Sequence, residues 1–174
     1  PIHVEDPTRE GYIFSGWDPS FSATMPVSGE HYTAQWTPKM YHTIYILNGG
    51  TGQVTNKNVY YDETFTVNNP TKVGYTFEGW KVTLLGTEIG TLLSSGTKET
   101  SFKNLTATEN KIVMFNAQWS ANLDTEYTVN HHKENLEGSY DIETETLTGT
   151  TEGVTNAVDK NYAGFSLSGK VIQD

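Results

Sequence analysis

The sequence predicts a mainly β protein built from small tandem modules, and three observations lead to that prediction. A string that ends in tryptophan occurs twice, at 7–17 as PTREGYIFSGW and at 70–80 as PTKVGYTFEGW. Apolar and polar residues alternate after the first glycine of both copies, with the period of two that is typical of a half-buried strand. Threonine is the commonest residue, and it is accompanied by 10 tyrosines and 7 phenylalanines, which are types that suit pleated surfaces.

The start of each string predicts one short helical turn. A polar residue precedes a proline, and a glycine follows later in the same string. A capping side chain, a proline at the first helical position and a glycine at the exit are the signals of a helix start and stop. These residues are Asp6, Pro7 and Gly11 in the first copy, and Asn69, Pro70 and Gly74 in the second.

The second half of each string predicts a strand whose aromatic side chains face a core. Gly16 and Gly79 precede the tryptophans, and each either leaves space beside an indole ring or permits a bulge where the strand bends. Aromatic side chains supply much of the apolar area of small cores. The candidate core residues of the repeats are Tyr12, Phe14, Trp17, Trp36, Tyr75, Phe77, Trp80, Trp119 and Phe165.

Matched segments farther along the chain define three repeats. Tyr32–Trp36 (YTAQW) follows the first string and Phe115–Trp119 (FNAQW) follows the second, so each copy ends on a similar strand. The expected domains are a partial repeat one at 1–39, a complete repeat two at 40–121 and a truncated repeat three at 122–174. Because the chain opens inside a repeat, we expect it to be a piece of a longer protein.

Repeat two contains the whole plan of the repeat. Alternation predicts a strand over 41–47, glycines predict a turn over 48–52, and a returning strand is expected over 59–67. The segment between the two tryptophans of this repeat is about twice as long as in repeat one. We expect 84–95 and 97–108 to form an added hairpin or a long loop.

Repeat three follows the same plan in diverged form. An alternating strand is expected over 127–131, a hairpin turn over 136–140 and the returning strand over 141–147. Farther on, GFSLSG at 164–169 parallels GYTFEG at 74–79.

Charge and composition exclude several function classes. The net charge is −10, and no cluster of lysine and arginine interrupts the acidic background, so phosphate backbones and anionic lipids are repelled. We therefore expect no nucleic acid partner, and no membrane insertion by this segment. Without cysteine, neither disulfides nor thiol chemistry is available, and the cores must hold by packing.

Two polar stretches carry weak hints of a site. His131 and His132 with Glu134 suggest a metal, but adjacent strand residues point to opposite faces, which favours an ordinary solvated stretch. The glycine-rich segment 48–52 lacks the lysine, hydroxyl residue and following helix of a phosphate loop, which favours a hairpin turn.

An acidic strand is the remaining candidate. Asp141, Glu143 and Glu145 fall on one strand face and could gather oxygen ligands for Ca²⁺. Alternate residues of a strand stand about 7 Å apart, so without further loop ligands a polar face is the favoured interpretation. No arrangement of nucleophile, base and acid stands out. We expect no catalytic residues, no cofactor and no metal.

Several motifs resemble known families. The turn LNGGTG at 47–52, the two strings and the AQW endings resemble the Listeria–Bacteroides repeat, the B repeat of internalin-type surface proteins. Residues 127–169, with the run ETETLTGTT and the segment YAGF at 162–165, resemble a mucin-binding (MucBP-type) repeat. Both resemblances imply β-grasp, ubiquitin-like modules along adhesins of Gram-positive bacteria. They also imply an extracellular location, either attached to the cell wall or secreted.

Two classes of function are consistent with these observations. The first is a non-catalytic adhesin segment that acts as a stalk or binds a host or matrix glycoprotein or glycan, mucin included. The second is an accessory, carbohydrate-binding module of a larger secreted enzyme, since tyrosine and tryptophan can stack on sugar rings. The four tryptophans recur in register with the repeat, which favours core packing.

The incomplete repeats at the two ends leave two alternatives. Either the chain associates weakly head to tail, or each half folds alone because the repeat boundaries are shifted from the domain boundaries. Half-repeats at both ends would expose strand edges, and an open edge invites pairing with another chain. We expect 164–169 of one chain to lie near 12–17 or 32–36 of the next.

Overall fold

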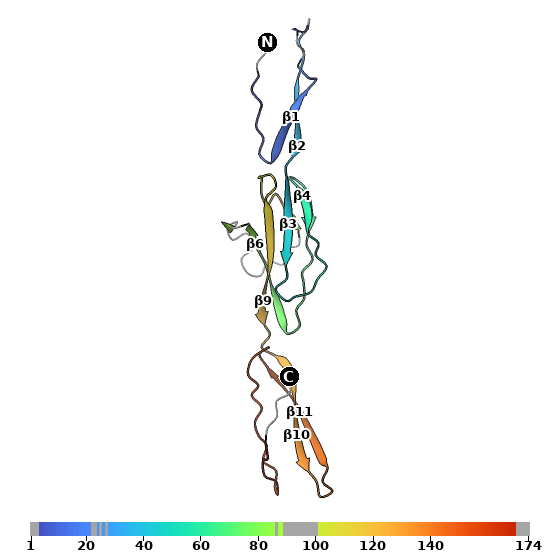
Figure 1. Cartoon of the computed structure of the whole chain (residues 1–174), viewed down its shortest axis with the longest axis vertical. Helices are drawn as coiled ribbons and strands as arrows, with labels where there is room; N and C mark the ends of the chain where they lie inside the picture. The colour runs from blue at the N-terminus through green and yellow to red at the C-terminus, as the bar shows by residue number, and fades with distance from the viewer. Residues whose placement is uncertain are drawn as a thin grey trace. The chain divides into compact units, whose positions relative to one another are not determined.

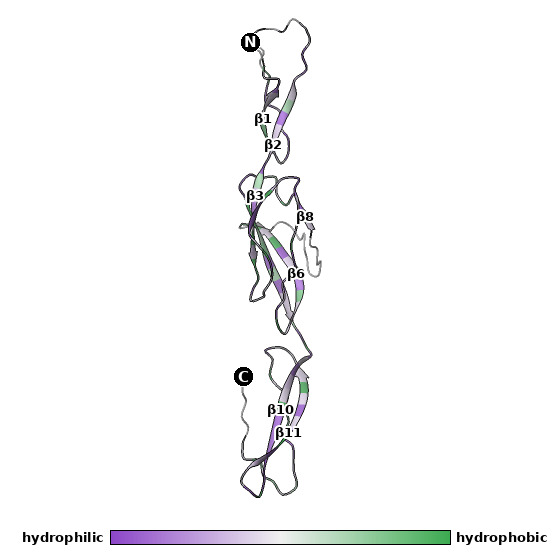
Figure 2. Ribbon diagram, turned by 90° about the vertical axis from the view of Figure 1, so that its right-hand side faces the viewer, coloured by the Kyte–Doolittle hydropathy of each residue, from purple (hydrophilic) through white to green (hydrophobic). Residues whose placement is uncertain are grey.

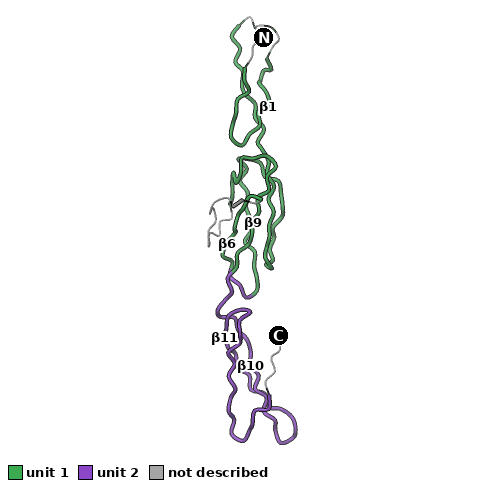
Figure 3. The backbone as a smooth tube through the Cα atoms, turned by 60° about the vertical axis from the view of Figure 1, so that its left-hand side comes forward, with its two compact units in different colours: residues 1–73, 77–119 green, residues 74–76, 120–174 purple. Residues whose placement is uncertain are grey.

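The computed structural model describes residues 4–21, 24, 26, 28–85, 87–88 and 101–169. These residues form eleven strands and no helix, which confirms the predicted mainly β class (Figure 1). The chain divides into two compact units, coloured in Figure 3. Unit 1 comprises 1–73 and 77–119, and unit 2 comprises 74–76 and 120–174.

Unit 1 begins with an antiparallel hairpin of β1 (Tyr12–Asp18) and β2 (Thr33–Pro38). The register shifts between Phe14 and Gly16, so the predicted bulge is confirmed in this copy. Gly16 has a φ of +124°, and a Cβ built there would meet no described atom within 4 Å. The glycine is therefore needed for its backbone conformation and not for space beside the indole.

The largest sheet of unit 1 has the strand order β4-β3-β9-β6-β7 (Figure 1). Strands β3 and β9 pair in parallel, whereas β4 and β7 pair antiparallel with their neighbours β3 and β6. The strands are β3 (Met40–Ile46), β4 (Lys57–Tyr60), β6 (Tyr75–Leu84), β7 (Thr87–Glu88) and β9 (Ile112–Ala121). A small antiparallel sheet joins β5 (Thr64–Thr66) to β8 (Ser101–Lys103).

One aromatic-rich core holds these strands together. Trp80 is fully buried, and its ring meets Phe115 edge to face with centroids 6.0 Å apart. Such pairs add to the stabilisation that burial of apolar area provides. The buried apolar side chains are Tyr41, Val59, Phe65, Val67, Trp80, Val82, Phe102, Val113, Phe115 and Ala117. Polar and apolar residues alternate along β6, as the period-two pattern predicts (Figure 2).

The glycine-rich segment after β3 is a tight turn, as predicted. Asn48 and Gly49 have φ angles of +51° and +83°, and Gly50 N–H donates to the Leu47 carbonyl at 3.0 Å. Two positive φ angles in succession favour asparagine followed by glycine. Trp119 covers this turn, and its indole Nε1 donates to the Leu47 carbonyl at 2.9 Å.

The helical turns predicted at the start of each string are wrong. Residues 5–9 form no helix, and Tyr12 N–H donates to the Arg9 carbonyl at 3.1 Å, which closes a single β-turn. Gly11 has a φ of +74°, as does Gly74 in the second copy. Glycine at the third position of a β-turn gives the same local pattern as glycine after a helix, so the motif was ambiguous.

One further expectation for repeat two needs correction, and a second lies partly outside the described residues. The single strand predicted over 59–67 is two strands, β4 and β5, because a β-turn at Tyr60–Glu63 interrupts it. In the added segment, β7 and β8 are short strands that belong to different sheets and do not pair with each other. Residue 86 and residues 89–100, which include half of the predicted hairpin or loop, lie outside the described residues.

Unit 2 contains a long antiparallel hairpin of β10 (Thr125–Glu134) and β11 (Tyr140–Gly149). The two strands predicted over 127–131 and 141–147 lie within it, so both are confirmed. The connecting turn is held by Asn135, whose side-chain oxygen accepts bonds from the backbone of Glu137 and Ser139. Residues 164–169 form no strand.

Candidate binding surfaces

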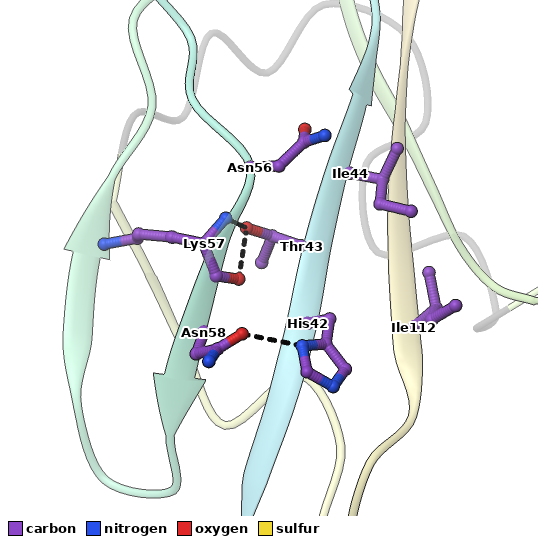
Figure 4. Close-up of a pocket in the computed structure, with 7 residues that line it drawn as sticks. All are labelled: His42, Thr43, Ile44, Asn56, Lys57, Asn58 and Ile112. Carbon is purple, nitrogen blue, oxygen red and sulfur yellow. Dashed lines mark hydrogen bonds between the residues drawn. The ribbon is translucent and has the colours of Figure 1, made fainter.

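Unit 1 has a small hollow on the sheet between β4, β3 and β9 (Figure 4). Its volume is about 310 Å³, at the lower end of small-molecule sites. The residues that line it are His42, Thr43, Ile44, Asn56, Lys57, Asn58 and Ile112.

The polar groups of this hollow bind one another. His42 Nδ1 and Asn58 Oδ1 are 2.6 Å apart. The buried Thr43 hydroxyl donates to the Lys57 carbonyl at 3.2 Å and accepts from the Lys57 N–H at 3.3 Å, as the dashed lines in Figure 4 show. Because these contacts stabilise the pairing of β3 and β4, the hollow is best explained as part of the sheet.

Unit 2 carries a charged cluster on one face of its hairpin. Lys160 Nζ lies 3.1 Å from Glu143 Oε1 and 3.0 Å from Glu145 Oε2, so it bridges the two carboxylates. His131 Nε2 is 3.0 Å from Glu145 Oε1, and the Tyr162 hydroxyl donates to Glu143 Oε2 at 3.0 Å. The segment that follows the hairpin is thereby bonded to the hairpin face.

The pKa values within this cluster follow from its pairing. Hydrogen bonds from Lys160 and Tyr162 lower the pKa of the Glu143 carboxyl to about 2. Hydrogen bonds to Glu145 and Glu143 raise the pKa of the Lys160 ammonium. The two glutamates are therefore ionised and bonded to a cation of the chain at neutral pH. This arrangement matches the polar strand face favoured from the sequence.

The other polar candidates are also surface features. His132 lies on the opposite hairpin face from His131 and packs near Tyr140, with ring centroids 5.9 Å apart. Asp141 is exposed and accepts a bond from Asn135 Nδ2 at 3.5 Å. Within the described residues, no group of three or more histidine, cysteine, aspartate or glutamate side chains could hold a metal ion. The same part of the chain contains no helix long and apolar enough to cross a membrane.

The aromatic residues of the second string lie in different environments. Trp80 is fully buried, whereas Phe77 and Trp119 are partly buried and pack against the core. Tyr75 is half-buried, and its hydroxyl donates to Glu152 Oε2 at 2.6 Å. Tyr75 therefore makes a polar contact at the surface, unlike Trp80.

The aromatic residues of the first string form a cluster on the β1–β2 hairpin. Phe14 packs edge to face against Trp17 and Trp36, with centroids 5.5 and 5.6 Å apart. Phe21 extends the cluster from Trp17 to a fifth aromatic residue, Tyr32. All five are half-buried, so within the described residues this cluster of repeat one is not a fully enclosed core.

The remaining sequence candidates divide between buried and exposed positions. Pro70 is buried and Pro7 is half-buried. Phe165, which we expected in a core, has 49% of its surface exposed and packs only loosely on Tyr162, with centroids 6.4 Å apart. Tyr12, expected in a core, is half-buried and donates its hydroxyl to a carboxylate.

Sequence reasoning missed several residues that make these contacts. Asp62 and Glu152 each accept a hydrogen bond from a tyrosine hydroxyl of the strings, and Lys160 pairs with the carboxylates of β11. The only local signal was a pair of similar segments, YYDE at 60–63 and TTEG at 150–153, each after a β-rich run. Four residues with one shared acidic position are too few to recognise as a repeat.

The class of protein follows from the fold and these surfaces: a β protein of tandem repeats, in which recurring aromatic residues pack together and the polar groups of the surfaces pair with one another. Comparison with family models places the chain more specifically. The model of the Listeria-Bacteroides repeat domain matches residues 2–36 and 41–114, which is more than half of the sequence, and the chain belongs to that family.

The family match confirms the first resemblance drawn from the sequence, and its two segments fall in repeats one and two. It does not extend over repeat three, and no family model supports the mucin-binding resemblance there. The Listeria-Bacteroides repeat is found in extracellular surface proteins. Comparison with curated proteins and with solved structures found no match.

Proposed function

We propose that the chain is a non-catalytic repeat segment of a bacterial cell-surface adhesin, acting as a stalk and as a binding module for a host or matrix glycoprotein. The observation that carries this proposal is that the recurring tryptophans of repeat two pack in its core. Trp80 is fully buried and Trp119 packs on the same core. Residues that recur because they hold each repeat together are expected of an array whose function is extension and display.

The strand arrangement supports a β-grasp description of repeat two. The parallel pair of β3 and β9 is flanked by one antiparallel partner, β4, on the outer side of β3. For repeat three we propose a module of the mucin-binding type, on the resemblance of its sequence at 143–151 and 162–165.

An extracellular position, attached to the cell wall or secreted by a Gram-positive bacterium, is part of the proposal. The membership of the chain in a repeat family of surface proteins supports it. The ligand class that we propose is a glycoprotein or glycan, mucin included. A nucleic acid ligand is disfavoured by the net charge of −10.

One observation favours a second candidate function, a carbohydrate-binding module of a larger secreted enzyme. Tyr60 and Tyr140 have 49% and 58% of their surface exposed. Exposed tyrosine rings can stack on sugar rings, because one side of the residue is apolar and its hydroxyl is polar.

A binding screen of the purified chain against glycans, mucins and matrix proteins tests both candidates. The adhesin proposal predicts binding to a glycoprotein that survives in Tyr60→Ala and Tyr140→Ala. Binding to a structural polysaccharide that is lost in either variant would establish the second candidate instead. Turnover of any glycan by the purified chain would contradict the proposal that it is non-catalytic.

A further inference from the structure

The glycine in the middle of each string lies against a side chain from a distant turn. Gly11 and Gly74 share a φ of +74°. A Cβ built on Gly11 would overlap the ring of Tyr61, and one built on Gly74 would stand 2.7 Å from Thr151 Cγ2. Any side chain at these glycines would therefore displace the turn, as well as straining the backbone.

The two turns that reach these glycines have the same construction. Glu63 N–H donates to the Tyr60 carbonyl at 3.0 Å, and Gly153 N–H donates to the Thr150 carbonyl at 2.9 Å. The third residue of each turn has a left-handed backbone, with φ of +67° at Asp62 and +58° at Glu152. Both third residues are acidic.

The backbone around each glycine is bonded in the same way. In the first case, Lys39 N–H donates to the Gly11 carbonyl at 2.8 Å, and the Lys39 carbonyl accepts from Tyr61 N–H at 2.8 Å. One residue thus links the glycine to the turn.

In the second case, Asn122 takes the place of Lys39. Asn122 N–H donates to the Gly74 carbonyl at 2.9 Å, and the Asn122 carbonyl accepts from Thr151 N–H at 2.9 Å. The Thr151 hydroxyl adds a bond to the Gly74 carbonyl at 2.6 Å. The residues of this contact all belong to unit 2, and those of the first contact all belong to unit 1.

The tyrosine after each glycine binds the acidic residue of the turn. Tyr12 hydroxyl donates to Asp62 Oδ2 at 2.6 Å, and Tyr75 hydroxyl donates to Glu152 Oε2 at 2.6 Å. Hydrogen bonds to an ionised acceptor are short and strong compared with neutral ones. The same chemistry thus occurs twice, although aspartate and glutamate differ in length.

The direction of these contacts is also the same. The Gly11 contact joins the string of repeat one to a turn of repeat two, and the Gly74 contact joins the string of repeat two to a turn of repeat three. In each case the string precedes the turn by one repeat. Matching space, backbone bonds and side-chain bonds at two places indicate a recurring docking contact and not two accidental ones.

We propose that the Gly-Tyr pair of each string, which we call the repeat corner, is the docking site for a β-turn of the following repeat. The partner that fits a repeat corner is a turn with tyrosine or threonine at its second position and a carboxylate at its left-handed third position. The missing Cβ of the glycine admits the second residue, and the tyrosine hydroxyl selects the carboxylate. Within unit 1, the first repeat corner thereby fixes repeat one to repeat two, whatever ligand the array binds.

A third glycine supplies the matched control. Gly164 has a φ of +85°, and Phe165 N–H donates to the Tyr162 carbonyl at 3.1 Å, as Tyr12 N–H does to Arg9. No described atom lies within 4 Å of a Cβ built on Gly164. Alanine at Gly164 therefore imposes the left-handed strain without any collision with a turn.

Spin-label distance measurements on the whole chain test the proposal. The chain has no cysteine, so Thr33→Cys in repeat one and Thr64→Cys in repeat two can be labelled cleanly at exposed strand positions. We expect a narrow distance distribution between the labels. Gly11→Ala should abolish the narrow peak, whereas Gly164→Ala should leave it unchanged.

Two conservative variants make the test independent of folding. Tyr12→Phe and Asp62→Asn each remove the hydroxyl–carboxylate bond with little change in shape, and both should broaden the distribution. The double variant should broaden it no more than Asp62→Asn alone, because Tyr12→Phe removes a bond to the carboxylate that Asp62→Asn already removes, whereas Asp62→Asn also changes the contacts of Asp62 with Asn104 and Lys103. A narrow peak that persists in Gly11→Ala would overturn the docking site, and one that persists in both conservative variants would overturn selection by the carboxylate.

Discussion

The aromatic residues of the repeated string have two different roles: some pack in the core, and others bind a turn of the next repeat. Trp80 is buried among aromatic side chains, and its role is packing. Tyr75, five positions earlier, keeps its hydroxyl at the surface and binds Glu152. The sequence placed both in one class because both are aromatic and both recur in register. What distinguishes them is a partner that lies in the next repeat, and no local pattern identifies it.

Replacement of Trp80 by alanine is expected to destabilise unit 1 strongly. Truncation of a buried tryptophan typically costs about 3–5 kcal/mol, since apolar contacts are lost and a cavity remains. Urea unfolding followed by circular dichroism would measure the loss. Thr66→Ala, at an exposed strand position, is the control and should change little. Equal stability of Trp80→Ala and the parent chain would contradict the packing role.

The first repeat corner should depend on pH at both ends of the scale. Hydrogen bonds from Tyr12, Asn104 and Lys103 hold the pKa of Asp62 well below its usual range. The contribution of Asp62 is present above the ordinary carboxyl pKa, and it is lost as pH falls through the lowered value. The bond to Asp62 also raises the pKa of Tyr12, even though the guanidinium of Arg9 opposes the shift. That contribution is present below about pH 10 and is lost as pH rises through the raised value.

Thermal unfolding across pH would measure this dependence. We expect a plateau between the ordinary pKa of a carboxyl group and that of a tyrosine, with a decline on either side. Asp62→Asn should remove part of the acid-side decline. If the parent chain and Asp62→Asn declined identically with acid, Asp62 would not be linked to folding.

At the scale of elements, the sequence predicted the strands and turns that depend only on neighbouring residues. The hairpin β10–β11, the strand β3 and the bulge at Gly16 all follow from patterns within a few residues. The parallel pairing of β3 with β9 joins segments far apart in the chain, and no short pattern specifies it. The turn at Tyr60–Glu63 was hidden because two successive tyrosines favour a strand.

The turn after β3 offers a prediction of its own. A Cβ on Gly50 would overlap Trp119 Cζ2, so Gly50→Ala should push the indole off the Leu47 carbonyl. Overpacking of this kind costs about 1–3 kcal/mol. Calorimetry of the variant should show a lower melting temperature. Gly29→Ala, where a Cβ meets no described atom within 4 Å, is the control, and an equal effect of both would contradict the contact.

At the scale of the whole molecule, the sequence supplied the repeats and the family, while the candidate site came from the structure. The repeats could be recognised in the sequence because an entire string recurs, and the family model confirms them over 2–36 and 41–114. The repeat corners could not be predicted from the sequence, because each joins a recurring glycine of the string to a turn of ordinary composition. Only the fold brings Gly11 to Tyr61.

Self-association remains a prediction for the whole molecule. In the described residues, β1 and β2 form a sheet of two strands, so each presents an outer edge with free backbone groups. Residues 164–169 form no strand, so the predicted partner edge is not preformed. Light scattering over a wide concentration range should show weak association at high concentration. A strictly constant monomer mass would eliminate the idea.

The proposal that the recurring tryptophans serve the fold is tested most directly by hydrogen exchange of their indole N–H groups. NMR would follow the four indole signals of the chain in D₂O, alone and with a mucin glycopeptide. We predict slow exchange at Trp80, which is buried, and at Trp119, which donates to Leu47, with both signals unmoved by the glycopeptide. Rapid exchange of both indoles, or a shift of both on addition of the glycopeptide, would contradict the account.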